Sequence, residues 1–150
     1  PTLRWDDLAR ARSWTHLPII VKGILHPGDA EAALTAGADD IWISNHGGRQ
    51  IDRSVPTLAV LPEIAARIGT RAPIIFDSGI RGGADAAIAL ALGATSVAIG
   101  RPYAYGLGIA GERGVHEVIR NHIAELDITL GLAGHTAVRE LSPDSLRRVR

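Results

Sequence analysis

The stretch DDIWISNHGGRQ, residues 39–50, joins a short apolar strand to a glycine-rich turn that carries a histidine and an arginine. His46 can transfer a proton near neutral pH, and the planar guanidinium of Arg49 matches the shape of a carboxylate. Gly47 and Gly48 let the backbone approach a ligand closely. A base beside a carboxylate-binding group indicates an enzyme that acts on a small organic acid.

The same order of a short apolar run, a polar loop and a helix recurs along the chain. The predicted strands cover residues 17–21, 39–44, 73–76 and 96–99, and the predicted helices cover residues 5–13, 29–35, 57–68, 83–92, 115–130 and 142–148. Continuous apolar runs are typical of parallel strands that other elements cover. Gly37, Gly69 and Gly93 stand where three of the helices should end. This order predicts an α/β fold with a parallel sheet, either open or closed into a barrel.

Composition limits the classes of function. The chain has 150 residues, 46% of them hydrophobic, which is enough for one domain with a core that should include Trp5, Trp14 and Trp42. Sixteen basic and sixteen acidic residues balance, so no nucleic-acid or anionic-membrane partner is expected. With no cysteine, no signal peptide and no apolar run near the roughly 20 residues of a membrane span, we expect a cytoplasmic protein. Because the chain also lacks methionine, even at position 1, we expect a fragment of a longer protein.

Polar residues and glycines follow each predicted strand. They are Lys22 after the first strand, Ser44, His46 and Arg49 after the second, Asp77, Gly79 and Arg81 after the third, and Gly100 and Arg101 after the fourth. The carboxyl ends of parallel strands carry the active sites of barrels and the ligand sites of open sheets. Residues 77–83 and 100–102 each lead from a strand into a predicted helix, so their backbone N–H groups and arginines predict a phosphate site.

Five segments, taken in order, closely resemble the FMN-dependent α-hydroxy-acid oxidase and dehydrogenase family. They are VKGI (21–24), ISNHGGRQ (43–50), DSGIRGG (77–83), ALALGA (89–94) and GRPYAYG (100–106). The third and fifth segments are most similar to the lactate 2-monooxygenase branch. The resemblance implies a TIM (β/α)8-barrel fold, of which residues 1–150 would form the C-terminal half: four βα units followed by C-terminal helices.

The resemblance also implies roles for individual residues. His46 would be the catalytic base and would bind the substrate together with Arg49. FMN would be bound by Lys22, Ser44, Asp77, Ser78, Gly79, Ile80, Arg81, Gly100 and Arg101. Lys22 would lie near flavin N1, Asp77 would accept hydrogen bonds from the ribityl chain, and the arginines would hold the phosphate. No metal is implied. Ser78 stands where many members have glycine, and a positive φ there would cost a serine roughly 1 kcal/mol.

The resemblance implies the oxidation of an (S)-2-hydroxy acid, lactate by preference, to the 2-oxo acid. Two electrons would pass to FMN, and the enzyme would be a homo-oligomer. Whether His46 takes the α-carbon proton or the hydroxyl proton stays open, as do the exact acid and the final electron acceptor. The main alternative is a truncated half-barrel without catalysis, which binds phosphate or FMN weakly or self-associates through its exposed sheet edges. An enzyme similar to inosine-monophosphate dehydrogenase would need a catalytic cysteine, and this chain has none.

Overall fold

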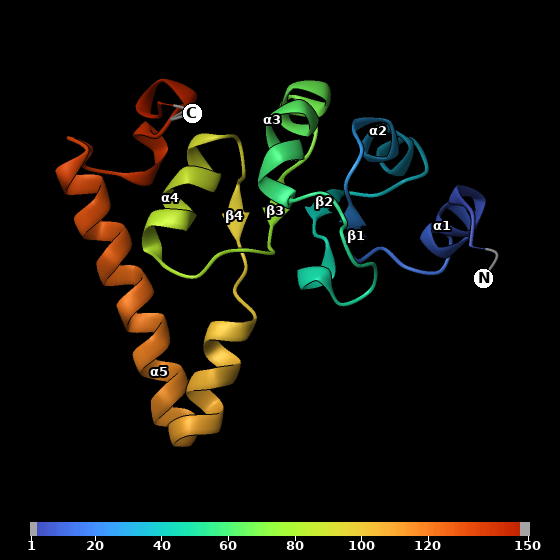
Figure 1. The fold of residues 1–150 in the computed structure, drawn as a ribbon. Helices are drawn as coiled ribbons and strands as arrows, with labels where there is room; N and C mark the ends of the chain where they lie inside the picture. The colour runs from blue at the N-terminus through green and yellow to red at the C-terminus, as the bar shows by residue number, and fades with distance from the viewer. Residues whose placement is uncertain (1–2, 148–150) are drawn as a thin grey trace.

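A parallel four-stranded sheet organises residues 3–147, the part of the chain that this computed structural model describes (Figure 1). The strands β1 (Ile20–Ile24), β2 (Asp40–Ile43), β3 (Ile74–Phe76) and β4 (Ser96–Val97) lie side by side in sequence order. The helices are α1 (Trp5–Arg12), α2 (Pro27–Thr35), α3 (Thr57–Ile68), α4 (Gly83–Ala91) and α5 (Arg101–Leu132). Short 3-10 turns cover His46–Gly48 (η1), Val138–Glu140 (η2) and Pro143–Ser145 (η3). The predicted strand–helix alternation is therefore confirmed.

The ends of three helices follow the predicted glycine signals. Gly37, Gly69 and Gly93 follow α2, α3 and α4 closely and have φ values of 103°, 57° and 109°. These values lie in the left-handed region, which glycine adopts without the steric cost of a Cβ atom. Each glycine turns the chain out of its helix and back toward the sheet.

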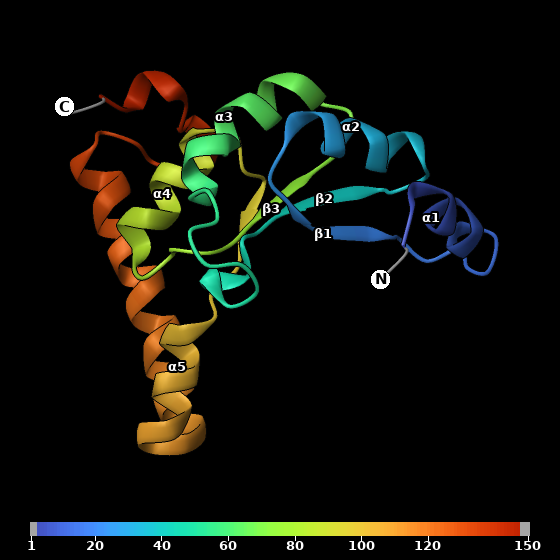
Figure 2. The same cartoon turned by 45° about the vertical axis from the view of Figure 1, so that its right-hand side comes forward.

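The core lies between one face of the sheet and the helices α2, α3 and α4, which all lie on that side (Figure 2). The strands contribute Ile41, Ile43, Ile74 and Phe76, and the helices contribute Ala30, Ala33, Leu61, Ile64, Ile68 and Ala89. Burial of each Ile or Phe side chain stabilises the fold by roughly 1.5–3 kcal/mol. Alternate residues point to the other face of the sheet, where the paired positions Lys22, Trp42, Ile75 and Ser96 are exposed or half-buried. The helices thus cover one face of the sheet.

The first strand is displaced from its predicted position, residues 17–21. It begins at Ile20 and continues through Lys22 to Ile24, while the side chain of Leu17 is 72% exposed. Pairing with β2 fixes these bounds, and the register shifts between Lys22 and Ile24, around Gly23 with φ 101°. A glycine inside a strand commonly marks such a bulge.

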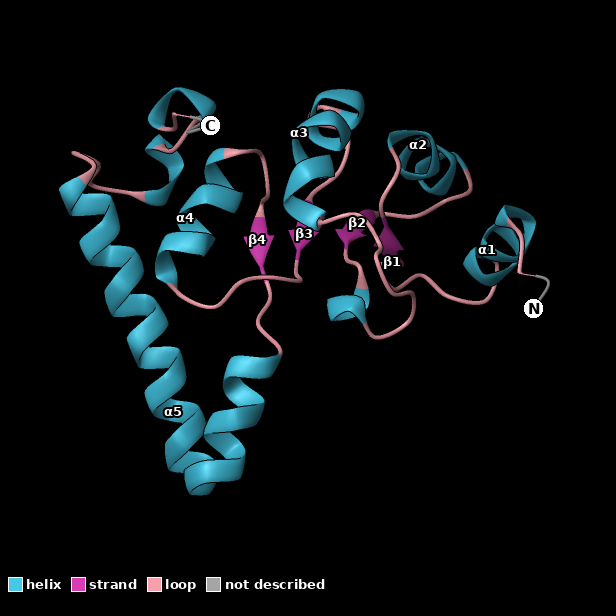
Figure 3. Cartoon of the chain, viewed as in Figure 1, coloured by secondary structure: helices cyan, strands magenta, loops and turns pink. Residues whose placement is uncertain are grey.

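Helix α5 is much longer than the predicted helix over residues 115–130. It reverses direction at Ala110 and Gly111, which have non-helical backbone angles, and forms a helical hairpin that projects from the sheet (Figure 3). Its two limbs touch where a Cβ atom on Gly114 would lie 1.9 Å from the carbonyl oxygen of Gly106. Gly106 and Gly114 are therefore contact points between two helical limbs.

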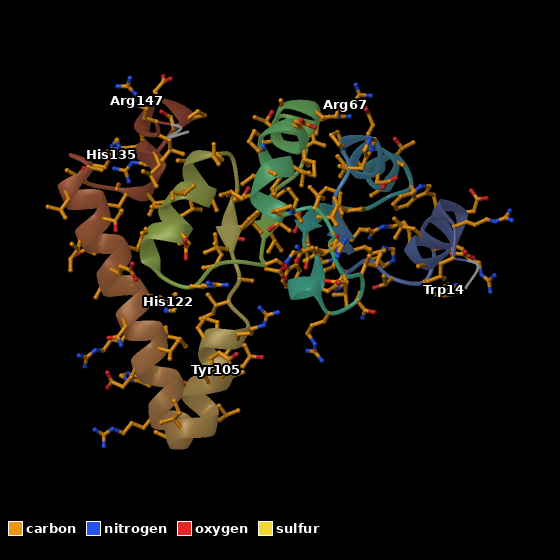
Figure 4. The ribbon with its side chains drawn as sticks, viewed as in Figure 1. Trp14, Arg67, Tyr105, His122, His135 and Arg147 are labelled. Carbon is orange, nitrogen blue, oxygen red and sulfur yellow. The ribbon has the colours of Figure 1, made fainter. Side chains whose placement is uncertain are left out.

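Two further predictions were wrong. The side chains of Trp5 and Trp14 are 39% and 70% exposed, so they lie outside the core, and Trp42 is half-buried. Trp14 lies beside α1, at the end of the molecule away from α5, with the Arg10 guanidinium carbon 5.4 Å from its ring centroid (Figure 4). The predicted helix over residues 142–148 is the short turn η3, and residue 148 lies outside the described residues.

No helix within residues 3–147 has both the length and the apolar character that a membrane-spanning segment requires.

Candidate functional site

An open cavity of about 660 Å³ lies at the carboxyl edge of the sheet. Its lining includes every predicted site residue except Ser44, namely Lys22, His46, Arg49, Asp77, Ser78, Gly79, Ile80, Arg81, Gly100 and Arg101. Ser44 is fully buried and hydrogen-bonded to Lys22, one of the lining residues. Trp42 and Tyr103 also line the cavity. The fold therefore brings Lys22, which lies inside β1, together with residues that follow the ends of β2, β3 and β4.

The wall of the cavity contains an ion pair between Lys22 and Asp77. The Lys22 ammonium also donates a hydrogen bond of 2.9 Å to the Ser44 hydroxyl and lies 4.2 Å from the centroid of the Trp42 ring. The indole N–H of Trp42 donates to Asp77 at 3.1 Å. Trp42 thus contacts both charged groups, a role that its place in an apolar strand did not indicate.

Asp77 has a lowered pKa. Burial by itself raises the pKa of this carboxyl group, but the ion pair with Lys22 and hydrogen bonds from the hydroxyls of Ser44 and Ser78 together lower it further than burial raises it. Asp77 therefore stays ionised across the neutral range and keeps the Lys22 ammonium in place.

His46 lies in the segment Asn45–Gly48, hereafter the histidine loop. His46, Gly47 and Gly48 have consecutive positive φ values of 55°, 65° and 75°, and the first of these is unusual for a residue with a side chain. Gly23 of β1 leaves room for the imidazole, because a Cβ atom there would lie 3.0 Å from His46 Nε2. Sequence reasoning assigned no role to Gly23, although a glycine inside a strand was a usable signal.

Serine hydroxyls hold the backbone of the histidine loop. Ser44 Oγ accepts a hydrogen bond from the N–H of His46 at 3.1 Å, and Ser78 Oγ accepts from the N–H groups of Asn45 and Gly47, both at 3.2 Å. Ser78 has a φ of 73°, so the positive φ that was considered for this position from the sequence is present. The buried Thr57 hydroxyl donates to the Ser78 carbonyl at 2.8 Å, and sequence reasoning missed this residue.

The three arginines of the cavity differ in their contacts. The Arg101 guanidinium donates to the carbonyl oxygen of Gly47 and so connects the start of α5 to the histidine loop. Within residues 3–147, the guanidinium groups of Arg49 and Arg81 are exposed and form no ion pair. Two positive charges on the cavity wall are therefore available to an anionic ligand.

The predicted phosphate site needs a correction at α4. The N–H groups of Arg81 and Gly82 donate to the Asp85 carboxylate at 2.9 and 3.2 Å, and that of Gly83 donates to Glu125 at 2.9 Å. The carboxylates of Asp85 and Glu125 thus occupy the helix start that the sequence predicted to be part of a phosphate site. The start of α5 has no side-chain cap, and its first residues line the cavity.

A smaller cavity of about 390 Å³ borders the histidine loop and shares five lining residues with the larger one, namely Gly47, Ser78, Gly79, Ile80 and Arg101. Its wall includes the apolar side chains of Phe76 and Ile88. Among the described residues, no group of three or more His, Asp or Glu side chains is arranged to hold a metal ion.

Comparison with known proteins gives one consistent result. The family described as FMN-dependent dehydrogenase matches residues 1–148. An L-lactate oxidase of Lysinibacillus sphaericus is 48% identical over 141 residues, which are 94% of this chain and 36% of the relative. A 2-hydroxyacid oxidase of Dictyostelium discoideum is 47% identical and aligns with 95% of this chain and 37% of its own length. The chain therefore spans little more than a third of the length of these curated relatives.

Solved structures agree with the sequence comparison. A lactate oxidase of Pediococcus acidilactici superposes with a TM-score of 0.95 at 44% identity, over 99% of this chain and 42% of the other. A mandelate oxidase variant with a monooxide FMN adduct superposes with a TM-score of 0.89 at 40% identity, over 93% of this chain and 44% of the other. These neighbours are TIM barrels, and the four βα units described here correspond to half of such a barrel, as predicted.

Proposed function

The chain belongs to the FMN-dependent dehydrogenase family, and from that premise we propose that it forms the C-terminal half of a catalytic domain that oxidises a small 2-hydroxy acid to the 2-oxo acid. The observation that carries the proposal is the cavity of about 660 Å³, in which His46 and Arg49 face the same space as Lys22 and Arg101. A base, a carboxylate-binding group and an anion-binding wall are the parts that such a reaction needs.

The residues of the cavity fit FMN. A volume of about 660 Å³ lies within the range of cofactor sites. Nothing lies within 4 Å of where a Cβ atom would stand on Gly79 or Gly100, so a ligand can reach the backbone at both positions. Arg81 and Arg101 with the uncapped start of α5 would hold the phosphate, and the backbone of residues 78–80 with Asp77 would hold the ribityl chain. When bound, FMN supplies the two-electron acceptor.

The remaining steps belong to the side chains of the cavity. Arg49 would bind the substrate carboxylate through two parallel hydrogen bonds and so orient the carbon that bears the hydroxyl. His46 would accept a proton from that carbon or from its hydroxyl, and a positioned base of this kind is worth roughly 10²–10⁴ in rate. Lys22, held in place by the ion pair with Asp77 and the hydrogen bond to Ser44, would place a positive charge beside the flavin ring.

Lactate is the proposed substrate. The curated relatives include L-lactate oxidases, and the Arg49 guanidinium selects for a carboxylate without selecting among small hydroxy acids. The homo-oligomer and the cytoplasmic location stay predictions. A second candidate is a half-barrel that binds FMN or phosphate without catalysis, and it is favoured by the sheet face that no helix of residues 3–147 covers (Figure 2).

One experiment separates the two candidates. FMN is added to the purified chain, the bound fraction is isolated on a sizing column, and its visible spectrum is recorded before and after anaerobic addition of lactate. The proposal predicts bound flavin that bleaches with lactate, and bleaching at least 100-fold slower for His46→Asn or Arg49→Met than for Arg53→Met, an exposed arginine outside the cavity. Flavin that binds but does not bleach with lactate, glycolate or mandelate would support the second candidate.

A further inference from the structure

The two serines that hold the histidine loop are the source of a further inference. We propose that Ser44 and Ser78 act as a clamp that positions His46, and that the Ser78 hydroxyl is a positioning group for the loop rather than a ligand of the cofactor. The catalytic meaning of this clamp rests on the function proposed above. The structural part, that the hydroxyls fix the loop, stands independently of that function.

The clamp occupies three consecutive N–H groups. The loop has left the sheet at Asn45, so the backbone N–H groups of Asn45, His46 and Gly47 have no strand partner, and each of them donates to a serine Oγ at 3.1–3.2 Å. The N–H groups that follow them, of Gly48 and Arg49, donate within the loop, to the carbonyls of Asn45 and His46. Every backbone N–H group from residue 45 to 49 is thus satisfied inside the protein, which defines one backbone path for His46.

The hydrogen-bonding capacity of Ser78 is used up by this role. A hydroxyl group has one donor and two acceptor positions. Ser78 donates to Asp77 Oδ1 at 2.6 Å and accepts from Asn45 and Gly47, so all three positions are taken. A flavin hydroxyl could bond to Ser78 Oγ only by displacing one of these partners. The side chain lines the cavity without offering it a free hydrogen-bonding position.

The backbone of Ser78 supports the same reading. Its φ of 73° is unfavourable for a residue with a Cβ atom, and such strain persists only where the surroundings fix it. Here Thr57, which is 1% exposed, holds the Ser78 carbonyl from the start of α3. A glycine at position 78 would adopt this conformation freely, but it would leave two loop N–H groups without an acceptor. The serine is thus a strained residue whose hydroxyl has a specific use.

The clamp also connects the loop to the charged wall of the cavity. Ser44 Oγ accepts from the Lys22 ammonium, and Ser78 Oγ–H donates to Asp77, the partner of Lys22. Both serines therefore join the backbone of the histidine loop to the ion pair that the flavin would face, Ser44 at His46 and Ser78 at Asn45 and Gly47. Movement of that pair on cofactor binding would reach the histidine loop through two hydroxyl groups.

Two variants of Ser78 test the clamp. Ser78→Ala removes the hydroxyl and keeps the strain, whereas Ser78→Gly removes both and is compatible with the observed φ, so the second variant keeps the test valid if the first does not fold. The first measurement is amide hydrogen exchange at Asn45 and Gly47 by NMR, and the second is the dissociation constant of added FMN. Arg53→Gly relieves a positive φ of 59° outside the cavity, and Ser96→Ala removes an exposed hydroxyl, so these two serve as matched controls.

The clamp predicts at least tenfold faster exchange at Asn45 and Gly47 in both Ser78 variants and no change in either control. It also predicts that FMN affinity changes by less than threefold, and that flavin reduction by lactate slows by tenfold or more with little change in the lactate concentration at half-maximal rate. Unchanged exchange at Asn45 and Gly47 would overturn the proposal. If FMN affinity also fell by tenfold or more, Ser78 would be a cofactor ligand instead. If the unmodified chain binds no FMN, the proposed function fails, and the exchange data still decide whether the serines clamp the loop.

Discussion

The starts of α4 and α5 follow neighbouring strands, and each combines glycine with arginine, yet their surroundings differ. At α4, Asp85 and Glu125 accept hydrogen bonds from three consecutive N–H groups. A Cβ atom on Gly83 would lie 2.1 Å from the backbone nitrogen of Leu126, whereas nothing lies within 4 Å of such an atom on Gly100. A glycine-rich helix start is therefore open to an external anion only where the chain supplies no carboxylate and no packing partner of its own.

The largest expected effect is the difference between adding a methyl group at the start of α4 and adding one at the start of α5. Gly83→Ala should lower the free energy of unfolding by about 3 kcal/mol, because the backbone of α5 at Leu126 cannot move away cheaply. Gly100→Ala should change it by less than about 1 kcal/mol, since the added atom meets open space. Urea unfolding of the two variants measures the contrast. Equal losses would show that the two glycines do not differ in the way described.

Removing one arginine from each start tests which of them holds a phosphate. Arg101→Gln should weaken FMN binding roughly 30-fold, the size expected for loss of a charge-assisted hydrogen bond. Arg81→Gln should weaken it only about threefold, because the carboxylates at the start of α4 already reduce the positive field there. Riboflavin, which lacks the phosphate, should bind both variants as it binds the unmodified chain. A similar loss of riboflavin affinity would instead point to distortion of the histidine loop, to which Arg101 donates.

The cap at α4 can be removed at Asp85, a residue that does not line the larger cavity. Asp85→Ala should lower the free energy of unfolding by about 1 kcal/mol, the usual value for a lost helix N-terminal cap. Asp29→Ala is the matched change in α2, where the N-terminal cap is His26, and it should cost only about 0.3 kcal/mol. Thermal unfolding of the two variants measures this difference. An equal cost would show that Asp85 does not stabilise α4 as a cap.

The smallest effect concerns Asp77, the carboxylate of the same loop that faces the cavity instead of the helix start. Because its pKa is lower in the folded chain than in the unfolded one, Asp77 stabilises the fold above the ordinary aspartate pKa of about 3.9, and this contribution is lost as the pH falls through the lowered value. Asp77→Asn should cost roughly 0.7 kcal/mol at pH 6, a small figure because Lys22 is 37% exposed. The cost of Asp77→Asn should vanish in strong acid, where the aspartate is protonated. Urea unfolding at pH 6 and at pH 2 measures this cost, and an equal cost at both pH values would show that the ion pair contributes nothing.

Much of the fold could be predicted because it depends on local signals. The bounds of α3 were predicted to the residue, and Gly37, Gly69 and Gly93 turn the chain where they were expected to. The displaced first strand and the hairpin of α5 could not be predicted in this way. Pairing with β2 decides where β1 begins, and the contact between Gly106 and Gly114 decides the shape of α5. Both depend on partners that a local pattern does not contain.

The same distinction applies to the site. The cavity residues were identified because each stands at the end of an apolar run or in the turn that follows it, and the parallel sheet brings those positions to one edge. The supporting contacts were missed because they join segments far apart in sequence. Glu125 reaches Gly83 across 42 residues, and Thr57 reaches Ser78 across 21. Gly23 was the exception, since its place inside a strand indicated a close approach that sequence reasoning did not use.

The order of the strands has a consequence for the kinetics of folding. Each strand after β1 pairs with the strand that precedes it in the sequence, so each parallel pairing requires only the one connection between them to close. The entropy lost in closing such connections grows only slowly with their length, and chains rich in near-neighbour contacts fold faster than chains with distant pairings. The sheet can therefore be extended during synthesis by one βα unit at a time. The segments that form the cavity would meet only when β4 joins and α5 begins, so the cavity is completed after the first three strands have paired.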